Sequence, residues 1–382
     1  MTMNLITTTA LATGMALALA GAASAEIRIG ATLSETGGAS FLGDPQGKTL
    51  KMLVDEINAN GGVLGEEIRL FMYDDGGDPN RARTFATRLI EDDEVVAVIG
   101  GTTTGTSMAI IPVFEEEEIP FISLAGAIEI IDPVRPYTFK TPHTDRMACA
   151  KIFEDMQARG ITRIGMISGS DGFGASMRNQ CLQIVGDYAI EVLADETYAP
   201  ADADMTPQLT NIKSNAQIEA VLNPGFGQGP AIVTRNYAQL AIDLPLYQSH
   251  GVASDGFIEL AGAQAAEGVR LPGTALLVAD LLAEDDPQRP VVEAYKAAYE
   301  GAHATPVSTF GGYAHDALRI LVDAMERAGS SDPQAVRDAI EETSGLVGTT
   351  GTVTMSADDH LGLTLDAFRM LEVRDGAWTL VD

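Results

Sequence analysis

Short apolar segments alternate with amphipathic segments along most of this chain, and this alternation restricts its fold more than any other feature. The apolar segments EIRIGATL, EEIRLFMYDD, VVAVIGG and PFISLAG are separated by helical patterns over about 45–60, 78–92 and 106–117. The same order recurs from RIGMISGS to IEAVLNPG. Strands that alternate with helices in this way form parallel sheets with right-handed crossovers. Two such series predict an α/β fold with two doubly wound parallel-sheet lobes.

The chain is expected to pass between these lobes more than once. An extended connector is predicted over Tyr137–Pro142, within YTFKTPHTD, and a return near EGVRLPGTALLVAD. We therefore assign 26–140 plus 275–345 to lobe 1, and 141–274 plus 346–382 to lobe 2. The C-terminal segment from TGTVTM to WTLVD predicts a small antiparallel unit, with Asp375-Gly376 as its hairpin turn.

The first 25 residues carry no Asp, Glu, Lys or Arg, and their apolar run ends in Ala23-Ser24-Ala25. This small-residue pattern predicts a cleavable signal peptide over residues 1–25. The alternative, a membrane anchor, needs about 20 apolar residues, and the run is shorter. The mature chain is then expected to work outside the cytoplasm.

Charge and motifs exclude several classes of function. The 54 acidic residues against 24 basic ones give a net charge of −30, which disfavours binding to nucleic acid or anionic membranes. The chain contains no nucleophile elbow, phosphate-binding loop or H-E-x-x-H helix, so an enzyme is not predicted. His315-Asp316 and Asp358-Asp359-His360 lack further ligands at metal spacing, so we predict no metal, and no cofactor is implied. The acidic run Glu115–Glu118 is interpreted as a solvated helix end.

Cys149 and Cys181 fall in two consecutive predicted helices of lobe 2. An exported protein can form a disulfide between them, and burial as free thiols is equally compatible with the sequence. The distance between two helices cannot be derived from the sequence.

Two strand-to-helix turns are rich in small and hydroxyl residues. One contains Thr102, Thr103 and Thr104 just before a helix, and the next strand runs into the turn Ser123–Ala127. In open α/β sheets, ligands bind at the carboxyl ends of strands, where helix N-termini favour negative charge. Ordinary helix capping explains such a turn on its own. Two adjacent turns of this type favour a site for a carboxylate.

Four segments resemble the leucine/isoleucine/valine-type periplasmic solute-binding proteins of ABC transporters. They are GATLSETGGASFLG, the stretch from LKMLVDEINANGG to FATRLI, the stretch from VAVIGGTTTG to FISLAGA, and RIGMISGSDGFGASM. The resemblance covers essentially the whole mature chain. It implies a periplasmic, monomeric clamshell whose lobes are joined by a three-strand hinge and close over a small ligand. It also implies delivery of that ligand to an inner-membrane ABC permease.

Site residues follow from the resemblance and from the turns described above. In the family, a hydroxyl and amides in the turn occupied by Thr103 and Thr104 hold a carboxylate, an aromatic at the position of Phe173 covers the ligand, and a tyrosine aligns with Leu42. Ala127 stands where the family has a threonine, which weakens that side of the site. The predicted ligand-binding residues are Ser40, Leu42, Thr103, Thr104, Ala125, Ala127, Phe173, Phe226 and His250.

His250 carries the main departure from the family. It aligns with an acidic residue that holds the ligand's α-ammonium group, and loss of that carboxylate would leave a buried ammonium without a counter-charge. The SHG turn around His250 resembles members associated with aromatic and other organic acids. We therefore expect a small carboxylate, aromatic acids included, packed between Phe173 and Phe226. The alternatives are a branched-chain amino acid as ligand, or a ligand sensor with the same fold; a plain loop position for His250 also stays open.

Overall fold

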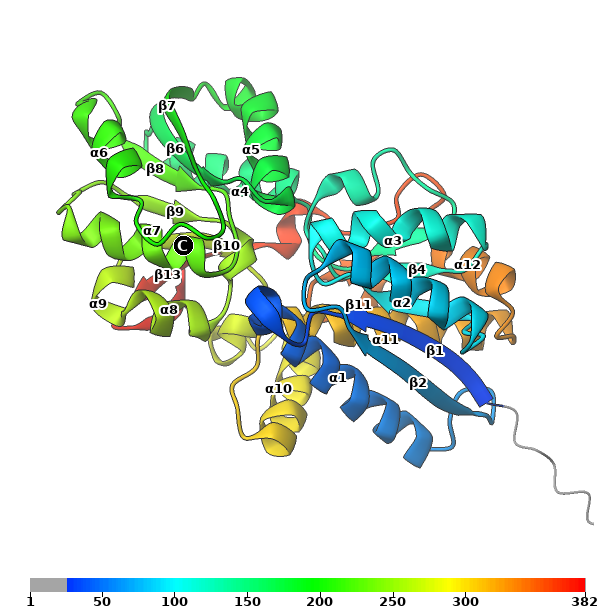
Figure 1. Cartoon of the computed structure of the whole chain (residues 1–382). Helices are drawn as coiled ribbons and strands as arrows, with labels where there is room; N and C mark the ends of the chain where they lie inside the picture. The colour runs from blue at the N-terminus through cyan, green and yellow to red at the C-terminus, as the bar shows by residue number, and fades with distance from the viewer. Residues whose placement is uncertain (1–25, 382) are drawn as a thin grey trace, which may run out of the picture.

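A computed structural model describes residues 26–381 as two α/β lobes side by side (Figure 1). The predicted signal peptide lies outside the described residues. The first lobe contains a parallel sheet of strand order β2-β1-β3-β4-β5. Its strands are β1 (Glu26–Leu33), β2 (Glu67–Asp74), β3 (Ala97–Gly100), β4 (Phe121–Ser123) and β5 (Thr138–Lys140).

The second lobe contains a larger sheet of order β14-β13-β10-β9-β8-β6-β7. The strands from β10 to β7 run parallel, and β13 and β14 add an antiparallel edge. These strands are β6 (Arg163–Gly169), β7 (Glu191–Tyr198), β8 (Ala220–Asn223), β9 (Leu246–Gln248), β10 (Arg270–Gly273), β13 (Arg369–Arg374) and β14 (Ala377–Leu380). The predicted fold class is confirmed.

Helices cover both sheets. In the first lobe they are α1 (Ser40–Ala59), α2 (Pro79–Glu91), α3 (Thr104–Glu116), α11 (Thr309–Ala328) and α12 (Pro333–Glu341). In the second they are α4 (Asp145–Ala158), α5 (Gly172–Ile184), α6 (Thr206–Ser214), α7 (Gln228–Gln239), α8 (Asp255–Ala261) and α9 (Ala263–Ala266). The remaining elements are α10 (Arg289–His303), the strands β11 (Leu346–Val347) and β12 (Thr352–Val353), and the short helices η1 (Gly37–Ala39), η2 (Ile128–Ile130), η3 (Val185–Tyr188), η4 (His250–Val252), η5 (Ala275–Leu281) and η6 (Leu365–Ala367). None of the helices within 26–381 is long and apolar enough to cross a membrane.

The strand order reverses once in each sheet, between β1 and β3 and between β6 and β8. Such a reversal leaves a crevice at the carboxyl ends of the strands, because the helices that follow them lie on opposite faces. The turns that leave β3, β4, β6, β8 and β9 carry residues that face the other lobe. The topology therefore directs both crevices toward the junction of the lobes.

Three chain segments connect the lobes. They run from β5 into α4, from α10 into α11, and from the segment after β12 into β13. The first and third run together, since the backbone N–H of Lys140 donates to the carbonyl of His360 at 3.1 Å.

After residue 274, the segments pack in a different lobe from the one predicted for them. Apolar side chains of η5 and α10 belong to the core of the second lobe, and Tyr295 of α10 also reaches Thr49 of α1, with their hydroxyl oxygens 2.7 Å apart. Residues from Val353 to Ala367 belong instead to the core of the first lobe. The amphipathic pattern shows that these segments are buried, but it does not show against which sheet they pack.

Local signals explain most element ends. Asp78 caps α2, accepting from the N–H groups of Asn80 at 2.7 Å and Arg81 at 3.1 Å, as predicted. Asp375 and Gly376 both have positive φ, as their hairpin turn requires, so that prediction is confirmed, although the hairpin extends the second sheet. The predicted start of the first helix at residue 45 is wrong, because α1 begins at Ser40. Burial of Leu42 against the core favours the longer helix despite the proline inside it.

The disulfide that the sequence left open is formed. Cys149 of α4 and Cys181 of α5 are bonded, with their Cα atoms 5.2 Å apart. The bridge joins two neighbouring helices on one face of the second sheet, and both cysteines lie in the same buried cluster.

Candidate functional site

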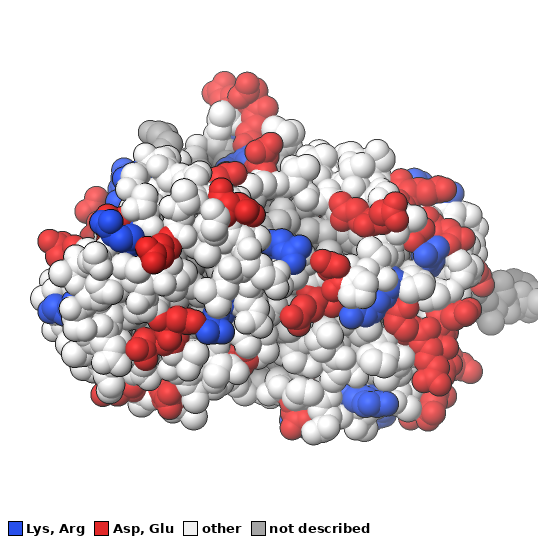
Figure 2. Space-filling view, turned by 90° about the horizontal axis from the view of Figure 1, so that it is seen from above, with Lys and Arg blue, Asp and Glu red and all other residues white. Residues whose placement is uncertain are grey.

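A cavity lies at the junction of the lobes. Its lining residues are Leu42, Thr102, Thr103, Thr104, Ala125, Gly126, Pro142, Phe173, Phe226, His250, Gly251, Phe310 and Tyr313. A larger hollow adjoins it and shares Thr103, Thr104, Phe173 and Phe226 with it. Seen from above, the face around this junction carries separate acidic patches and few basic side chains (Figure 2).

Seven of the nine predicted site residues line this cavity. Ser40 and Ala127 do not: Ser40 begins α1, and the Ala127 side chain is fully buried outside the cavity. What each lining residue does to a ligand stays a prediction.

The sequence interpretation missed Pro142, Gly251, Phe310 and Tyr313. The last two come from α11, which is distant in sequence from the turns that carried the prediction. No local signal marks them, because their apolar helical stripe is the same one that packs on the core.

The N-terminus of α3 provides the first polar group. The Thr103 hydroxyl accepts from the N–H of Thr106, and Thr106 Oγ1 accepts from the N–H of Thr103, which closes a capping box. Thr103 is therefore engaged in its own helix. The buried Thr104 hydroxyl has no hydrogen-bond partner. The N–H groups of Thr104 and Gly105 also have no carbonyl within the helix, because they lie in its first turn. A hydroxyl and free amides at a helix N-terminus suit an anion.

The second lobe closes over this helix end with α5. Asp171 caps α5, and its Oδ1 accepts from the N–H groups of Phe173 and Gly174, both at 3.0 Å. The helices α3 and α5 contact each other across the junction, so the two N-termini face the same space.

A chain of aromatic rings runs from one lobe to the other, and Phe310, Phe226, Phe173 and His250 of this chain line the cavity. The Phe41 ring centroid lies 5.7 Å from that of Phe310 and 6.4 Å from that of Phe226. Phe226 contacts Phe173 edge-on at 6.1 Å, and Phe173 contacts His250 at 5.4 Å. Flat apolar walls of this kind pack well against a planar ligand.

His250 and Tyr313 provide two further polar groups. The two ring nitrogens of His250 and the hydroxyl of Tyr313 have no hydrogen-bond partner, although both residues are buried. Burial, with the nearby charge of Lys140, lowers the pKa of His250 to about 3, so its imidazole is neutral near pH 7. A neutral imidazole offers one donor and one acceptor. Buried polar groups without partners are rare, and here three of them line one cavity.

Acidic side chains are absent from the lining of the smaller cavity. The larger hollow has one, Asp171, and burial raises the pKa of its carboxyl group. That carboxyl group already caps α5. The lining residues therefore offer no free carboxylate to a cation.

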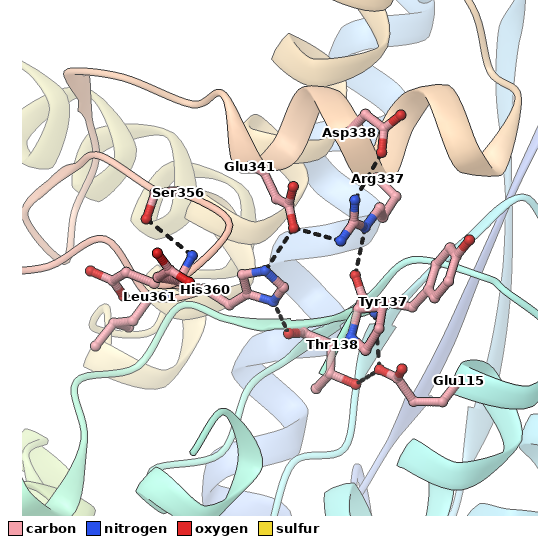
Figure 3. Close-up of polar contacts among 12 residues, drawn as sticks. Glu115, Tyr137, Thr138, Arg337, Asp338, Glu341, Ser356, His360 and Leu361 are labelled. Atoms are coloured by element: carbon pink, nitrogen blue, oxygen red, sulfur yellow. Dashed lines mark hydrogen bonds and ion pairs between the residues drawn. The ribbon is translucent and has the colours of Figure 1, made fainter. Parts of the chain in front are cut away.

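Both histidine pairs considered as metal ligands have structural partners. Asp316 accepts from His315 Nδ1, from the N–H groups of Thr349 and Thr350, both at 2.8 Å, and from the Thr350 hydroxyl. His360 lies between Thr138 O at 2.8 Å and Glu341 Oε1 at 3.0 Å (Figure 3). No group of three or more potential metal ligands occurs within 26–381.

The acidic run at the end of α3 is partly structural. Glu115 Oε1 accepts from the backbone N–H of Tyr137 at 3.0 Å and from the Thr138 hydroxyl at 2.5 Å (Figure 3). This carboxylate fixes the start of β5, so the interpretation of the whole run as solvated is wrong for Glu115.

Comparison with known proteins gives the family. A model of the Periplasmic binding protein family matches residues 26–377. The chain belongs to this family. Among curated relatives, the leucine-, isoleucine-, valine-, threonine- and alanine-binding protein of Pseudomonas aeruginosa is 25% identical over 333 residues, 85% of this chain and 86% of that protein. The resemblance inferred from the sequence is confirmed.

Solved structures of this periplasmic binding protein family share the fold. An extracellular ligand-binding receptor from Rhodopseudomonas palustris HaA2 is 28% identical with a TM-score of 0.87, over 94% of this chain and all of that one. The substrate-binding protein LivJ of Streptococcus pneumoniae, solved in complex with isoleucine, has a TM-score of 0.83 at 22% identity, over 94% of this chain and 99% of that one.

Proposed function

We propose that this protein is a periplasmic solute-binding protein that captures a small carboxylate without an α-ammonium group, aromatic acids included, and delivers it to an inner-membrane ABC permease. One observation carries the choice of ligand: the cavity lining contains no acidic side chain. An amino acid buried there would leave its ammonium group unpaired, which costs several kcal/mol, on the order of the penalty for burying a lone ion.

The polar groups of the cavity support a carboxylate. Thr104 and the free amides of α3 suit the negative charge, and the aromatic wall suits an apolar or planar body. His250 and Tyr313 are then available for a further oxygen atom of the ligand. The transport role and the permease partner rest on the family and on the predicted signal peptide. No group in the cavity is arranged as a nucleophile with its base, so we propose binding without chemistry.

A branched-chain amino acid is the second candidate. The name of the Pseudomonas aeruginosa relative favours it, since that protein is described as binding leucine, isoleucine and valine. The two candidates differ in one chemical group, the ammonium, which makes a direct comparison possible.

Thermal-shift and calorimetric titration of the chain from Glu26 onward test the proposal. The probes are leucine, isocaproate (the leucine analogue without its ammonium), benzoate, and methyl benzoate as a control without a carboxylate. We expect isocaproate or benzoate to stabilise the protein, by about 2.7 kcal/mol at 100 times Kd, and leucine and methyl benzoate not to. Stabilisation by leucine with none by isocaproate and benzoate would overturn the proposal in favour of the second candidate.

A further inference from the structure

Lys140 is fully buried beside the cavity, at the end of β5 where the first connection between the lobes begins. Its Nζ donates to the carbonyl of Ala127 at 3.2 Å. Ala125 and Gly126, just before Ala127, line the cavity, and so does Pro142, two residues after Lys140. The amino group therefore lies against the turn after β4, whose residues Ala125 and Gly126 line the cavity.

Lys140 forms no ion pair among residues 26–381. The carboxylate that acts electrostatically on Lys140 is that of Asp145, and it also serves other groups. Asp145 Oδ1 accepts from the N–H groups of Ile128 at 3.0 Å and Arg146 at 2.9 Å, and its Oδ2 accepts from the Ser176 hydroxyl. An ammonium group has three donors, and one of those on Lys140 is used. A buried ammonium in this state is costly unless a negative charge is brought near it.

The other ionisable groups near Lys140 do not supply that charge. His143 follows it on the connecting segment, and His250 faces it from η4. Arg369 of β13 acts on His143 and is itself cationic. Everything around the amino group apart from Asp145 is neutral or positive, while the cavity next to it suits an anion.

We propose that Lys140 is the charge partner of the bound carboxylate, and that ligand binding draws a proton onto its amino group. This inference rests on the proposed function, because it needs an anionic ligand. Lys140 acts on the ligand from outside the cavity lining, and its positive charge selects an anionic ligand.

Proton uptake follows from the burial. Desolvation lowers the pKa of Lys140 from 10.5 to about 7, so the amino group is mostly neutral at pH 8 and mostly charged at pH 6. A bound anion favours the charged form and raises the pKa of the lysine, which binds a proton above pH 7. His250, with a pKa of about 3, and His143, whose pKa lies well below its usual value because of burial, stay neutral over this range. The affinity should fall about tenfold between pH 6 and pH 8, by proton linkage at one site.

Calorimetry of the mature protein with benzoate tests this directly. Titrations at pH 8 in phosphate and in Tris, which differ in ionisation enthalpy, count the protons exchanged. We expect uptake of close to one proton per benzoate at pH 8 and almost none at pH 6. Benzoate binding with no proton uptake at pH 8 would overturn this inference and leave the proposed function standing. Absence of binding by benzoate and isocaproate, with leucine bound, would overturn the proposed function and this inference with it.

Variants separate the charge from the packing. K140M should bind benzoate more weakly at pH 6 and lose the tenfold pH dependence, with circular dichroism confirming that it folds. Lys296 is the matched control, because it is a partly exposed lysine on α10 paired with Asp280, away from the cavity. K296M should keep both the affinity and the pH dependence. A pH dependence retained in folded K140M would assign the proton to another group and contradict the proposal.

Discussion

At the scale of single residues, two neighbouring hydroxyl groups of the site differ in their hydrogen bonding. Thr103 and Thr104 are adjacent and chemically identical, yet the first completes a capping box and the second has a free, buried hydroxyl. The sequence identified the turn, because small and hydroxyl residues before a helix are a recognisable pattern. It could not tell which threonine is free, since that depends on the φ and ψ angles at the helix start.

Replacing Thr104 with Val should weaken binding of benzoate by about 1–3 kcal/mol, because a buried polar group of the ligand would lose its partner. The stability of the ligand-free protein should not fall. Calorimetric titration and urea unfolding measure the two quantities.

Thr103 provides the matched control for that change. T103V removes the helix cap and should lower the free energy of unfolding by about 1 kcal/mol, with a smaller effect on affinity. Equal effects of the two substitutions on affinity and on stability would contradict the division of roles.

At the scale of elements, the strands and most helices follow from the periodicity of the sequence, and the lobe limits do not. The segment with η5 and α10 is amphipathic, but its apolar side faces the second lobe while α11 faces the first. Phe310 and Tyr313 of α11 reach the cavity because α11 packs beside α1 in the tertiary structure. The surroundings of Lys140 could not be predicted either, because the sequence does not indicate which groups contact a single charged residue in a short strand.

The disulfide between α4 and α5 should contribute measurably to stability. It closes a loop with a sequence separation of 32 residues. The variant with both Cys149 and Cys181 changed to Ser should lose about 2–4 kcal/mol in free energy of unfolding, mainly through a less restricted unfolded chain. Urea unfolding measures the loss, and reduced wild-type protein should show the same midpoint as the variant. If the urea midpoint of the variant equalled that of the oxidised wild type, the disulfide would make no contribution to stability.

Asp316 joins α11 to the segment after β11 and should make stability depend on acid pH. Burial raises the pKa of its carboxyl group, but hydrogen bonds from His315, Thr349 and Thr350 outweigh burial and hold it below the usual value. A pKa lowered in the folded state gives stability that is present above about pH 4 and lost as the pH falls further.

D316N should therefore lower the free energy of unfolding at pH 7 by about 1–3 kcal/mol and flatten the loss of stability below pH 4. The control is D323N on the same helix, where a partly exposed carboxylate pairs with Arg327. That change should cost only a few tenths of a kcal/mol, about the value of an exposed i,i+4 pair. Urea unfolding curves between pH 3 and pH 7 measure these effects. Equal loss of stability on acidification in D316N and wild type would contradict the role of Asp316.

At the scale of the whole molecule, the structure has the lobes in contact over the cavity, and the fit between them depends on Gly126. A Cβ atom at this position would lie 2.8 Å from Phe173 Cε2 and 3.0 Å from His250 Nε2. Gly126 belongs to the first lobe, and both of these neighbours belong to the second. The missing side chain therefore matters for the contact between the lobes.

G126A should consequently separate binding from folding. Overpacking costs about 1–3 kcal/mol, and here it falls on the closed state alone, so the affinity for benzoate should drop about tenfold. We expect the lobes to separate in the ligand-free protein, so its unfolding temperature should not change. Small-angle scattering should show a decrease in radius of gyration on saturation with benzoate in wild type, and a smaller decrease in G126A. The control is Gly301 on α10, where a Cβ atom meets nothing within 4 Å, so G301A should keep wild-type affinity. If G126A instead destabilised the ligand-free protein and kept its affinity, the contact with Phe173 and His250 would persist without ligand, and closure would not be the step that binds.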